Sequence, residues 1–332
     1  MRRLVMGLIM AAMATGGAVT SALAQSGADF FKGKTVNYIV ATNPGGGYDV
    51  NGRLVAEFMQ KYLPGSTFVV RNMAGAGHIL GTNYVYASEP DGLTIGTFNT
   101  GLIYSQLAGN QAIKFDLEKM SWIGNIGADP RVFLMSKGSG VENYAELTGL
   151  EKPVKFAAPG VGTASTIETT LLVDVLKLPI QVVTGYNGND DLLAMRRGEV
   201  GGMFSFRSSF QSFVDEGHGH FVAQIGGEQT EVPSLASLVT DEKAQPVISL
   251  IEAQSNLARL TAGPPGIPED RLQALRDAYA AATSDPEFLK RAASLGLPIA
   301  PTVGQDVADA VTKAMDQPEE IVAVLKTALR DK

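Results

Sequence analysis

Hydrophobic and polar positions change period repeatedly along the first third of the chain. Short runs rich in β-branched and apolar residues occupy 35–42, 67–71 and 93–98. Between them, apolar residues recur at helical spacing from Asp49 to about Pro64 and again over 77–88. Strand, helix and strand at these distances predict a parallel sheet with right-handed crossovers.

The same alternation starts again after Trp122. Strands are predicted at 131–136, 154–158, 180–184 and 200–204, with helices at 165–176 and 190–197, and the tail after Pro268 is mostly helical. The chain shows neither an internal repeat nor a low-complexity linker. We therefore expect two lobes joined within strands, with crossings near residues 128 and 261. Lobe 1 would comprise 25–127 and 262–332, and lobe 2 would comprise 128–261.

The first 24 residues have the order of a secretory signal peptide. Arg2 and Arg3 form a basic head, residues 4–19 form an apolar run too short to span a bilayer, and Ala22-Leu23-Ala24 offers a cleavage site. The mature chain is expected to begin at Gln25. Because the chain has no cysteine, no lipid anchor is expected, and the periplasm is the predicted location.

Charge and composition exclude several classes of protein. The formal net charge is −7, and removal of a leader with two arginines and no acid lowers it to −9. Nucleic-acid binding depends on Lys and Arg neutralising phosphates, so no nucleic-acid partner is expected. The absence of cysteine excludes zinc–thiolate sites and Cys nucleophiles. No cofactor is predicted.

A loop of three glycines separates the first strand from the first helix. The run Asn43-Pro44-Gly45-Gly46-Gly47-Tyr48-Asp49 lies at the carboxyl edge of the predicted sheet. Glycines let backbone N–H groups approach a ligand closely, and a helix N-terminus adds positive partial charge. The pattern favours an anion site, although a tight turn with Asp49 as a helix cap is the alternative.

Two further loops repeat this chemistry. Residues 74–81 follow the second strand, but their glycine spacing departs from the dinucleotide fingerprint. Residues 159–166 lie in the second predicted lobe and add hydroxyl groups. Three such loops on two lobes predict a cleft whose walls both offer hydrogen-bond donors.

Residues suited to catalysis are few. The only histidines are His78, His218 and His220. His218 and His220 have no acidic or histidine partner at ligand spacing, so a solvated loop is favoured over a metal site. No nucleophile or orienting acid is recognisable near His78, which is expected to line the pocket or cap the turn. Residues 205–209 lack the nucleophile-elbow pattern. Neither a catalytic site nor a metal site is predicted.

Motifs in this order resemble the Bug family, the periplasmic solute receptors of tripartite tricarboxylate transporters. The resemblance extends over essentially the whole mature chain. It rests on Pro-Gly-Gly-Gly-x-Asp at 44–49 with Arg53, Arg71-Asn72 with Gly75-Ala76-Gly77, Asp91-Gly92-x-Thr94, Pro159-Gly160-Val161-Gly162-Thr163, Gly185-Tyr186, Arg197-Gly198-Glu199-Val200, Pro264-Pro265-Gly266-Ile267-Pro268 and Leu295-Gly296.

The resemblance implies an α/β, type II periplasmic-binding-protein fold with two lobes, mainly parallel sheets and a ligand cleft between them. It also implies a small carboxylate ligand and, as partners, the membrane subunits of the transporter; a monomer is expected. A periplasmic sensor in signalling and a secreted hydrolase are the alternatives. Tyr48, Ala74 and His78 depart from the usual family pattern, so the ligand of better-known relatives does not transfer.

The expected ligand site combines the three loops with neighbouring strand ends, and no arginine is expected to clamp the carboxylate. Asp49 is expected to order the first loop, because like charge would keep it from the anion. The predicted ligand-binding residues are Asn43, Gly46, Gly47, Tyr48, Ala76, Gly77, His78, Asn99, Thr163, Ala164, Ser165, Tyr186 and Phe206.

Overall fold

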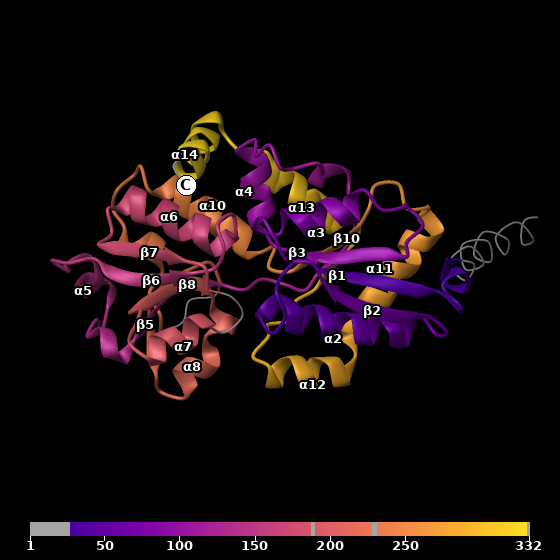
Figure 1. Cartoon of the computed structure of the whole chain (residues 1–332), viewed down its shortest axis with the longest axis horizontal. Helices are drawn as coiled ribbons and strands as arrows, with labels where there is room; N and C mark the ends of the chain where they lie inside the picture. Colours follow the sequence, from indigo (N-terminus) through magenta and orange to yellow (C-terminus); the bar gives the residue numbers. More distant parts are fainter. Residues whose placement is uncertain (1–26, 187–189, 228–230, 331–332) are drawn as a thin grey trace, which may run out of the picture.

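Two α/β lobes lie side by side along the long axis of the molecule in the computed structural model, which describes residues 27–186, 190–227 and 231–330 (Figure 1). The predicted signal peptide, residues 1–24, lies outside the described residues. Each lobe is built on one sheet with helices on both faces. This is the layered α/β arrangement that the alternating pattern predicts.

The first lobe has a six-stranded sheet in the order β11-β4-β10-β3-β1-β2. Helices α2, α11 and α12 cover one face of this sheet, and α3, α4 and α13 cover the other. The strands are β1 (Thr35–Val40), β2 (Thr67–Asn72), β3 (Thr94–Phe98), β4 (Ser121–Asn125), β10 (Leu260–Gly263) and β11 (Thr302–Val303). The helices are α2 (Gly47–Tyr62), α3 (Ile79–Tyr86), α4 (Gly101–Leu107), α11 (Glu269–Ser284), α12 (Pro286–Ser294) and α13 (Gln305–Met315).

The second lobe has a five-stranded sheet in the order β7-β6-β8-β5-β9. Helices α7 and α8 lie against one face, while α6 and α10 pack on the other face over Phe133, Phe156 and Phe204. The strands are β5 (Arg131–Ser136), β6 (Val154–Ala158), β7 (Ile180–Thr184), β8 (Gly202–Phe206) and β9 (Gly219–Ile225). The helices are α5 (Tyr144–Thr148), α6 (Ala164–Leu176), α7 (Asp190–Arg196), α8 (Gln211–Asp215), α9 (Leu235–Leu238) and α10 (Gln245–Ser255).

Both sheets are mixed, whereas mainly parallel sheets were expected. The pairs β1–β2, β1–β3, β6–β7 and β6–β8 are parallel, but β5 and β10 are antiparallel to the strands on either side of them. The direction of these two strands follows from where the chain enters each lobe. The chain reaches β5 and β10 from the other lobe, so each begins at the sheet edge where β3, β6 and β8 end and runs in the opposite direction.

The two crossing segments lie next to each other between the lobes. Residues 126–130 connect β4 to β5, and residues 256–259 connect α10 to β10. Backbone hydrogen bonds join them: Ala258 N donates to Gly127 O, and Ile126 N donates to Arg259 O. The second crossing precedes residue 261, since all of β10 belongs to the first sheet.

The last helix, α14 (Glu319–Arg330), packs on the second lobe, although its residues fall in the range expected for lobe 1. Ile321 and Leu325 belong to the same hydrophobic core as the buried residues of α6, and Figure 1 shows α14 beside α6 at the C-terminal end of the chain. The chain thus passes between the lobes a third time. None of the helices in the described ranges combines the length and hydropathy that a bilayer crossing requires.

Candidate functional site: a cleft between the lobes

A cavity of about 730 Å³ lies where the carboxyl ends of strands from both sheets face each other. Twelve of the thirteen residues that the sequence predicts as ligand contacts line it, and the exception is Ala164. The first lobe contributes the loops after β1 and β2, and the second lobe contributes the loop after β6 and the end of β8. A concave site of this size with polar groups from several loops is typical of small-molecule binding.

The loop after β1 places the start of α2 in the cavity wall. Gly47 and Tyr48 belong to the first turn of α2, so no intrahelical carbonyl can accept from their N–H groups. Gly45, with φ +89°, turns the chain before the helix begins. Such a helix start suits a negatively charged group.

Asp49 holds this loop in place from behind. Its carboxylate accepts hydrogen bonds from Gly45 N at 2.9 Å, Asn72 Nδ2 at 2.8 Å and Arg53 Nε at 3.0 Å. Burial alone would raise the pKa of Asp49, but these hydrogen bonds outweigh it and hold the pKa below its usual value. The ionised side chain is therefore used within the loop, and Asp49 is absent from the cavity wall.

The loop after β2 has an unusual backbone. Gly75, Ala76, Gly77 and His78 all have positive φ, at +146°, +47°, +61° and +76°. Left-handed conformations are costly for residues with a Cβ, so Ala76 and His78 depend on the surrounding structure. His78 is buried, and its Nδ1 lies 2.9 Å from Ala41 O. Burial lowers the pKa of His78 to about 4, so the ring is neutral at physiological pH.

The two lobes touch directly at this loop. A Cβ built on Gly77 would lie 2.6 Å from the backbone carbon of Gly162, which follows β6. Only glycine permits this approach. On the second lobe, Thr163 precedes α6 and bonds to Thr166 at 3.0 Å, while Ser165 Oγ bonds to Ser205 Oγ at 2.7 Å. Thr163, Ser165 and Ser205 all line the cavity.

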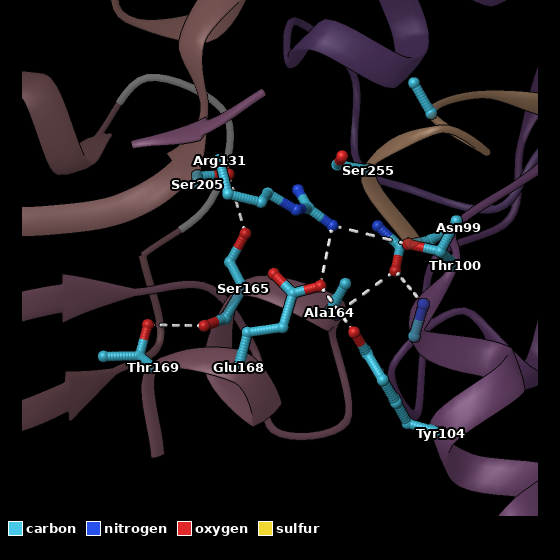
Figure 2. A network of polar contacts seen from close by, with 12 residues as sticks. Asn99, Thr100, Tyr104, Arg131, Ala164, Ser165, Glu168, Thr169, Ser205 and Ser255 are labelled. Carbon is cyan, nitrogen blue, oxygen red and sulfur yellow. Dashed lines mark hydrogen bonds and ion pairs between the residues drawn. The ribbon is translucent and has the colours of Figure 1, made fainter. Parts of the chain in front are cut away.

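Ala164 lies outside the cavity wall because its N–H group is already used. It donates to Asn99 Oδ1 at 3.1 Å, and the same oxygen accepts from Gly101 N at 2.7 Å (Figure 2). Asn99 follows β3 in the first lobe, so this contact joins the lobes. Asn99 itself remains among the cavity-lining residues.

Aromatic side chains line part of the cavity. Tyr48 lies with its ring centroid 5.8 Å from that of His78 and 6.2 Å from that of Phe206. Its hydroxyl donates to Ala258 O at 3.0 Å, and burial raises the pKa of Tyr48 to about 12. Tyr186, after β7, is half-buried and lies on the second-lobe side.

Arg259, which is not among the ligand contacts predicted from the sequence, also contributes to the cavity wall. Its guanidinium lies 5.0 Å from the centre of the Phe206 ring. Nη1 pairs with Asp129 at 3.1 Å, and Nη2 donates to Ser208 Oγ at 3.0 Å. Arg259 and Asp129 are each 1% exposed and lie on the two different crossing segments. The only sign in the sequence that Arg259 has a role in the site is its position as a lone basic residue among apolar neighbours just before β10.

A second buried ion pair lies beside the first. Arg131, the first residue of β5, stacks 3.6 Å from the centre of the Phe206 ring and pairs with Glu168 at 3.0 Å, both side chains being fully buried. Figure 2 shows Tyr104 from the first lobe reaching this pair, with its hydroxyl donating to Glu168 at 3.0 Å. Arg131 Nη2 also reaches Thr100 Oγ1 at 3.4 Å. Burial raises the pKa of Glu168, against the opposing effect of Arg131.

Asp191 is a further charged cavity residue absent from the predicted ligand contacts. It stands in the first turn of α7, and its carboxylate accepts from Leu192 N at 2.7 Å. Within the described residues no cation pairs with it. Burial, with a contribution from Asp190, raises the pKa of Asp191 to about 6.

The remaining histidines lie away from the cavity. A solvated loop is expected from the sequence for His218 and His220, but His220 is part of strand β9 and its Nε2 bonds to Val141 O at 3.0 Å. Strand β9 begins at Gly219 and its burial does not alternate with period two, so the sequence pattern does not reveal it. No group of three potential metal-ligating side chains occurs in the part of the chain that the structure describes.

A family profile and individual relatives place this chain in the same protein family. The profile described as TctC, "Tripartite tricarboxylate transporter family receptor", matches residues 52–326. A UPF0065 protein from the TAR-I ttuE-ttuC' intergenic region of Agrobacterium vitis is 27% identical over 301 residues, covering 87% of this chain and 81% of the relative. Protein BugT of Bordetella pertussis is 40% identical over 68 residues, which is 20% of this chain and 21% of BugT.

Solved structures share the fold. MatC from Rhodopseudomonas palustris, with bound malate, superposes with a TM-score of 0.71 at 21% identity, covering 90% of this chain and 99% of MatC. The periplasmic binding protein BugD gives 0.73 at 20% identity, covering 89% and 97%. R. palustris Rpa4515 with adipate gives 0.72 at 18% identity, with the same coverage. The two-lobed periplasmic-binding-protein fold expected from the sequence is thus confirmed.

Proposed function

Because this chain belongs to the receptor family of the tripartite tricarboxylate transporters, we propose that it binds a small carboxylate in the cleft and delivers it to such a transporter. It acts in the periplasm as a monomer, and its partners are the membrane subunits of the transporter. The malate and adipate held by MatC and Rpa4515 support a carboxylate as the ligand. The receptor has no catalytic step of its own.

The observation that carries this proposal is the distribution of donors around the cavity. The wall at α2 offers N–H groups of a helix start, and the wall at α6 offers the hydroxyls of Thr163 and Ser165. Hydrogen bonds to a charged group contribute about 1.5–3 kcal/mol each, so a few of them give micromolar binding, about −8 kcal/mol. The donors must act locally, because a formal net charge of −7 does not attract an anion from a distance.

The same distribution suggests how the ligand is enclosed. Loops 43–49 and 74–78 can dock an anion on the first lobe alone, whereas Thr163 and Ser165 contact it only when the second lobe is close. Their binding energy is realised in the closed state, which therefore gains population when ligand binds. The crossing segments 126–130 and 256–259 would serve as the hinge.

Replacement of Gly47 by valine tests this site. A Cβ on Gly47 would lie 3.5 Å from Arg259 Nη2 and Ser209 Oγ, an ordinary contact, so the fold should survive while the branched side chain fills the cavity. We expect mono-, di- or tricarboxylates to raise the melting temperature of the wild type, and Gly47→Val to lose this shift. Gly138→Val is the control, since Gly138 is exposed on the second lobe with open space around its Cβ position.

Delivery to a transporter is tested by uptake. Cells lacking this protein should fail to take up the carboxylate identified in the screen, and the wild type and Gly138→Val should restore uptake where Gly47→Val does not. A wild type that gives no thermal shift with any carboxylate would overturn the proposed ligand class. Uptake that persists without the protein would overturn the transport role.

A further inference from the structure

The hydrogen bonding of His78 defines what its ring offers to the cavity. Nδ1 lies 2.9 Å from the carbonyl oxygen of Ala41. A carbonyl oxygen can only accept, so the proton of this bond belongs to Nδ1. The ring is neutral, because burial keeps the pKa of His78 near 4. We therefore assign the Nδ1–H tautomer, in which Nε2 carries a lone pair and no proton.

No protein donor uses this lone pair within the described residues. Ala41 engages Nδ1, and no hydrogen bond joins Nε2 to another group. Tyr48, whose ring centroid lies 5.8 Å from that of His78, donates its hydroxyl to Ala258 O instead. His78 is 8% exposed, and its ring borders the cavity. The cavity thus presents an imidazole acceptor beside the backbone N–H groups of the Gly-rich loops.

The second lobe adds another acceptor at the cavity. The carboxylate of Asp191 receives hydrogen bonds from the backbone N–H groups of Leu192 and of Asp191 itself, and has no cation partner among the described residues. A ligand bearing carboxylates alone would supply only acceptors to these two groups, leaving Nε2 of His78 without a partner and facing the Asp191 carboxylate with like charge. A buried polar group without a partner costs free energy, whereas a ligand N–H or O–H group would satisfy it.

We propose that this receptor selects carboxylates that carry a hydroxyl or amino group on the carbon chain, and that Nε2 of His78 accepts a hydrogen bond from that group. This inference rests on the proposed function, because it specifies the ligand of the same cleft. The Nδ1–H···O bond to Ala41 orients the ring for the task. The left-handed backbone of loop 75–78 places His78 at the cavity, where Ala76 and Gly77 provide no side chain that could accept.

His78→Asn separates the two ring nitrogens. Asparagine tolerates a positive φ, and its Nδ2 can take the place of Nδ1 and keep the bond to Ala41, but it has no acceptor where Nε2 lies. His78→Gln is the complementary variant, because its side-chain amide oxygen can reach the position of Nε2. His218→Asn is the control for the substitution itself, since His218 is exposed and lies outside the cavity.

The measurement is calorimetric affinity for three matched series. These are propionate, lactate and alanine; succinate, malate and aspartate; and glutarate, 2-hydroxyglutarate and glutamate. In the series that binds, the wild type should prefer the hydroxy or amino member to the plain acid by about tenfold, as expected for one buried hydrogen bond. This ratio should fall to near one in His78→Asn, recover at least partly in His78→Gln, and stay unchanged in His218→Asn.

Three results would overturn the inference. The first is a wild type that binds the plain acid as tightly as its substituted partners. The second is a preference that persists in His78→Asn. The third is proton uptake on binding that disappears in His78→Asn, because the ring would then bind as a cation and donate. If no carboxylate binds at all, the proposed function fails along with the inference, whereas binding without discrimination overturns the inference alone.

Discussion

The two walls of the cleft are built in different ways. The wall around loops 43–49 and 74–78 consists of glycines, helix-start N–H groups and left-handed backbone from two continuous segments. The wall at the junction of the lobes consists of side chains from separate segments, with the Phe206 ring next to the guanidinium groups of Arg131 and Arg259. The first wall provides backbone N–H donors, which the hydroxyls of Thr163 and Ser165 complement from the second lobe, while the junction determines the shape of the cavity.

The charges of the second wall are balanced within the protein. Arg131 pairs with Glu168, and Arg259 pairs with Asp129. Moving two opposite charges out of water costs solvation free energy, and their mutual attraction offsets this cost only when the geometry is good. Such a pair therefore adds little net stability, although the loss of one partner is strongly destabilising. The arginines therefore brace the lobe junction, and the ligand's charge is left to the N–H and hydroxyl groups. The contrast between the walls can be tested in three ways.

The largest effect is expected from Arg131→Met. Glu168 would lose its charge partner while fully buried, and such a change costs about 3–5 kcal/mol of unfolding free energy. Urea denaturation measures the loss. The double variant Arg131→Met with Glu168→Gln should recover a large part of it, because it removes both charges.

Arg196→Met provides the comparison for this experiment. Arg196 pairs with Glu216 at the surface, where both side chains are about half exposed, and an exposed pair contributes about 0–1 kcal/mol. If Arg131→Met were no more destabilising than Arg196→Met, the buried pair would not brace the junction.

An intermediate effect is expected from Gly77→Ala in the first wall. The added Cβ would overlap the backbone of Gly162 at 2.6 Å, and the left-handed φ of +61° adds about 1–2 kcal/mol of strain. The second lobe could then no longer approach, so we expect ligand affinity to fall by at least about tenfold. Small-angle scattering should show that the wild type becomes more compact with saturating ligand and that the variant does not.

Gly109→Ala separates strain from overlap. Gly109 also has a left-handed φ, +74°, but its Cβ position is open. It should lose a similar amount of stability and keep its ligand affinity. Equal compactness of wild type with and without ligand would argue against closure, whatever the variant does.

The smallest effect is a dependence of affinity on pH. The pKa of Asp191 is raised to about 6, so its carboxylate is charged at pH 7.5 and mostly neutral at pH 5.5, while His78 stays neutral throughout. A plain monocarboxylate, which titrates near the ordinary value of a carboxyl group, remains largely ionised over this range. Its affinity should rise a few-fold as the pH falls, since a repulsion on the order of 1 kcal/mol is removed.

Asp191→Asn should abolish this dependence and bind at pH 7.5 as the wild type does at pH 5.5. An amino acid ligand should show the opposite direction, because its ammonium group is attracted by the charged form. Calorimetry at the two pH values distinguishes these cases, and an unchanged slope in Asp191→Asn would exclude Asp191 as its source.

The sequence by itself determined the elements that rely on local pattern. Strands at 35–40, 67–72 and 154–158 agree with their predictions within two residues, because alternation and turn residues act over short distances. The Gly-rich loops were recognisable for the same reason, since the geometry at Gly45 and Gly77 follows from glycine's backbone freedom. Strands β4 and β10, which flank the two crossing segments, are too short for an alternating pattern of apolar residues to be recognised, and the sequence does not predict them.

Only the tertiary structure decided which side chains meet at the junction. Arg259 and Asp129 are 130 residues apart, and Arg131 and Glu168 are 37 apart, so no local period links either pair. The direction of β5 and β10, the position of α14 and the commitment of the Ala164 N–H to Asn99 also depend on how the lobes face each other. Periodicity reports which face of an element is buried, but it carries no information about which element will cover that face.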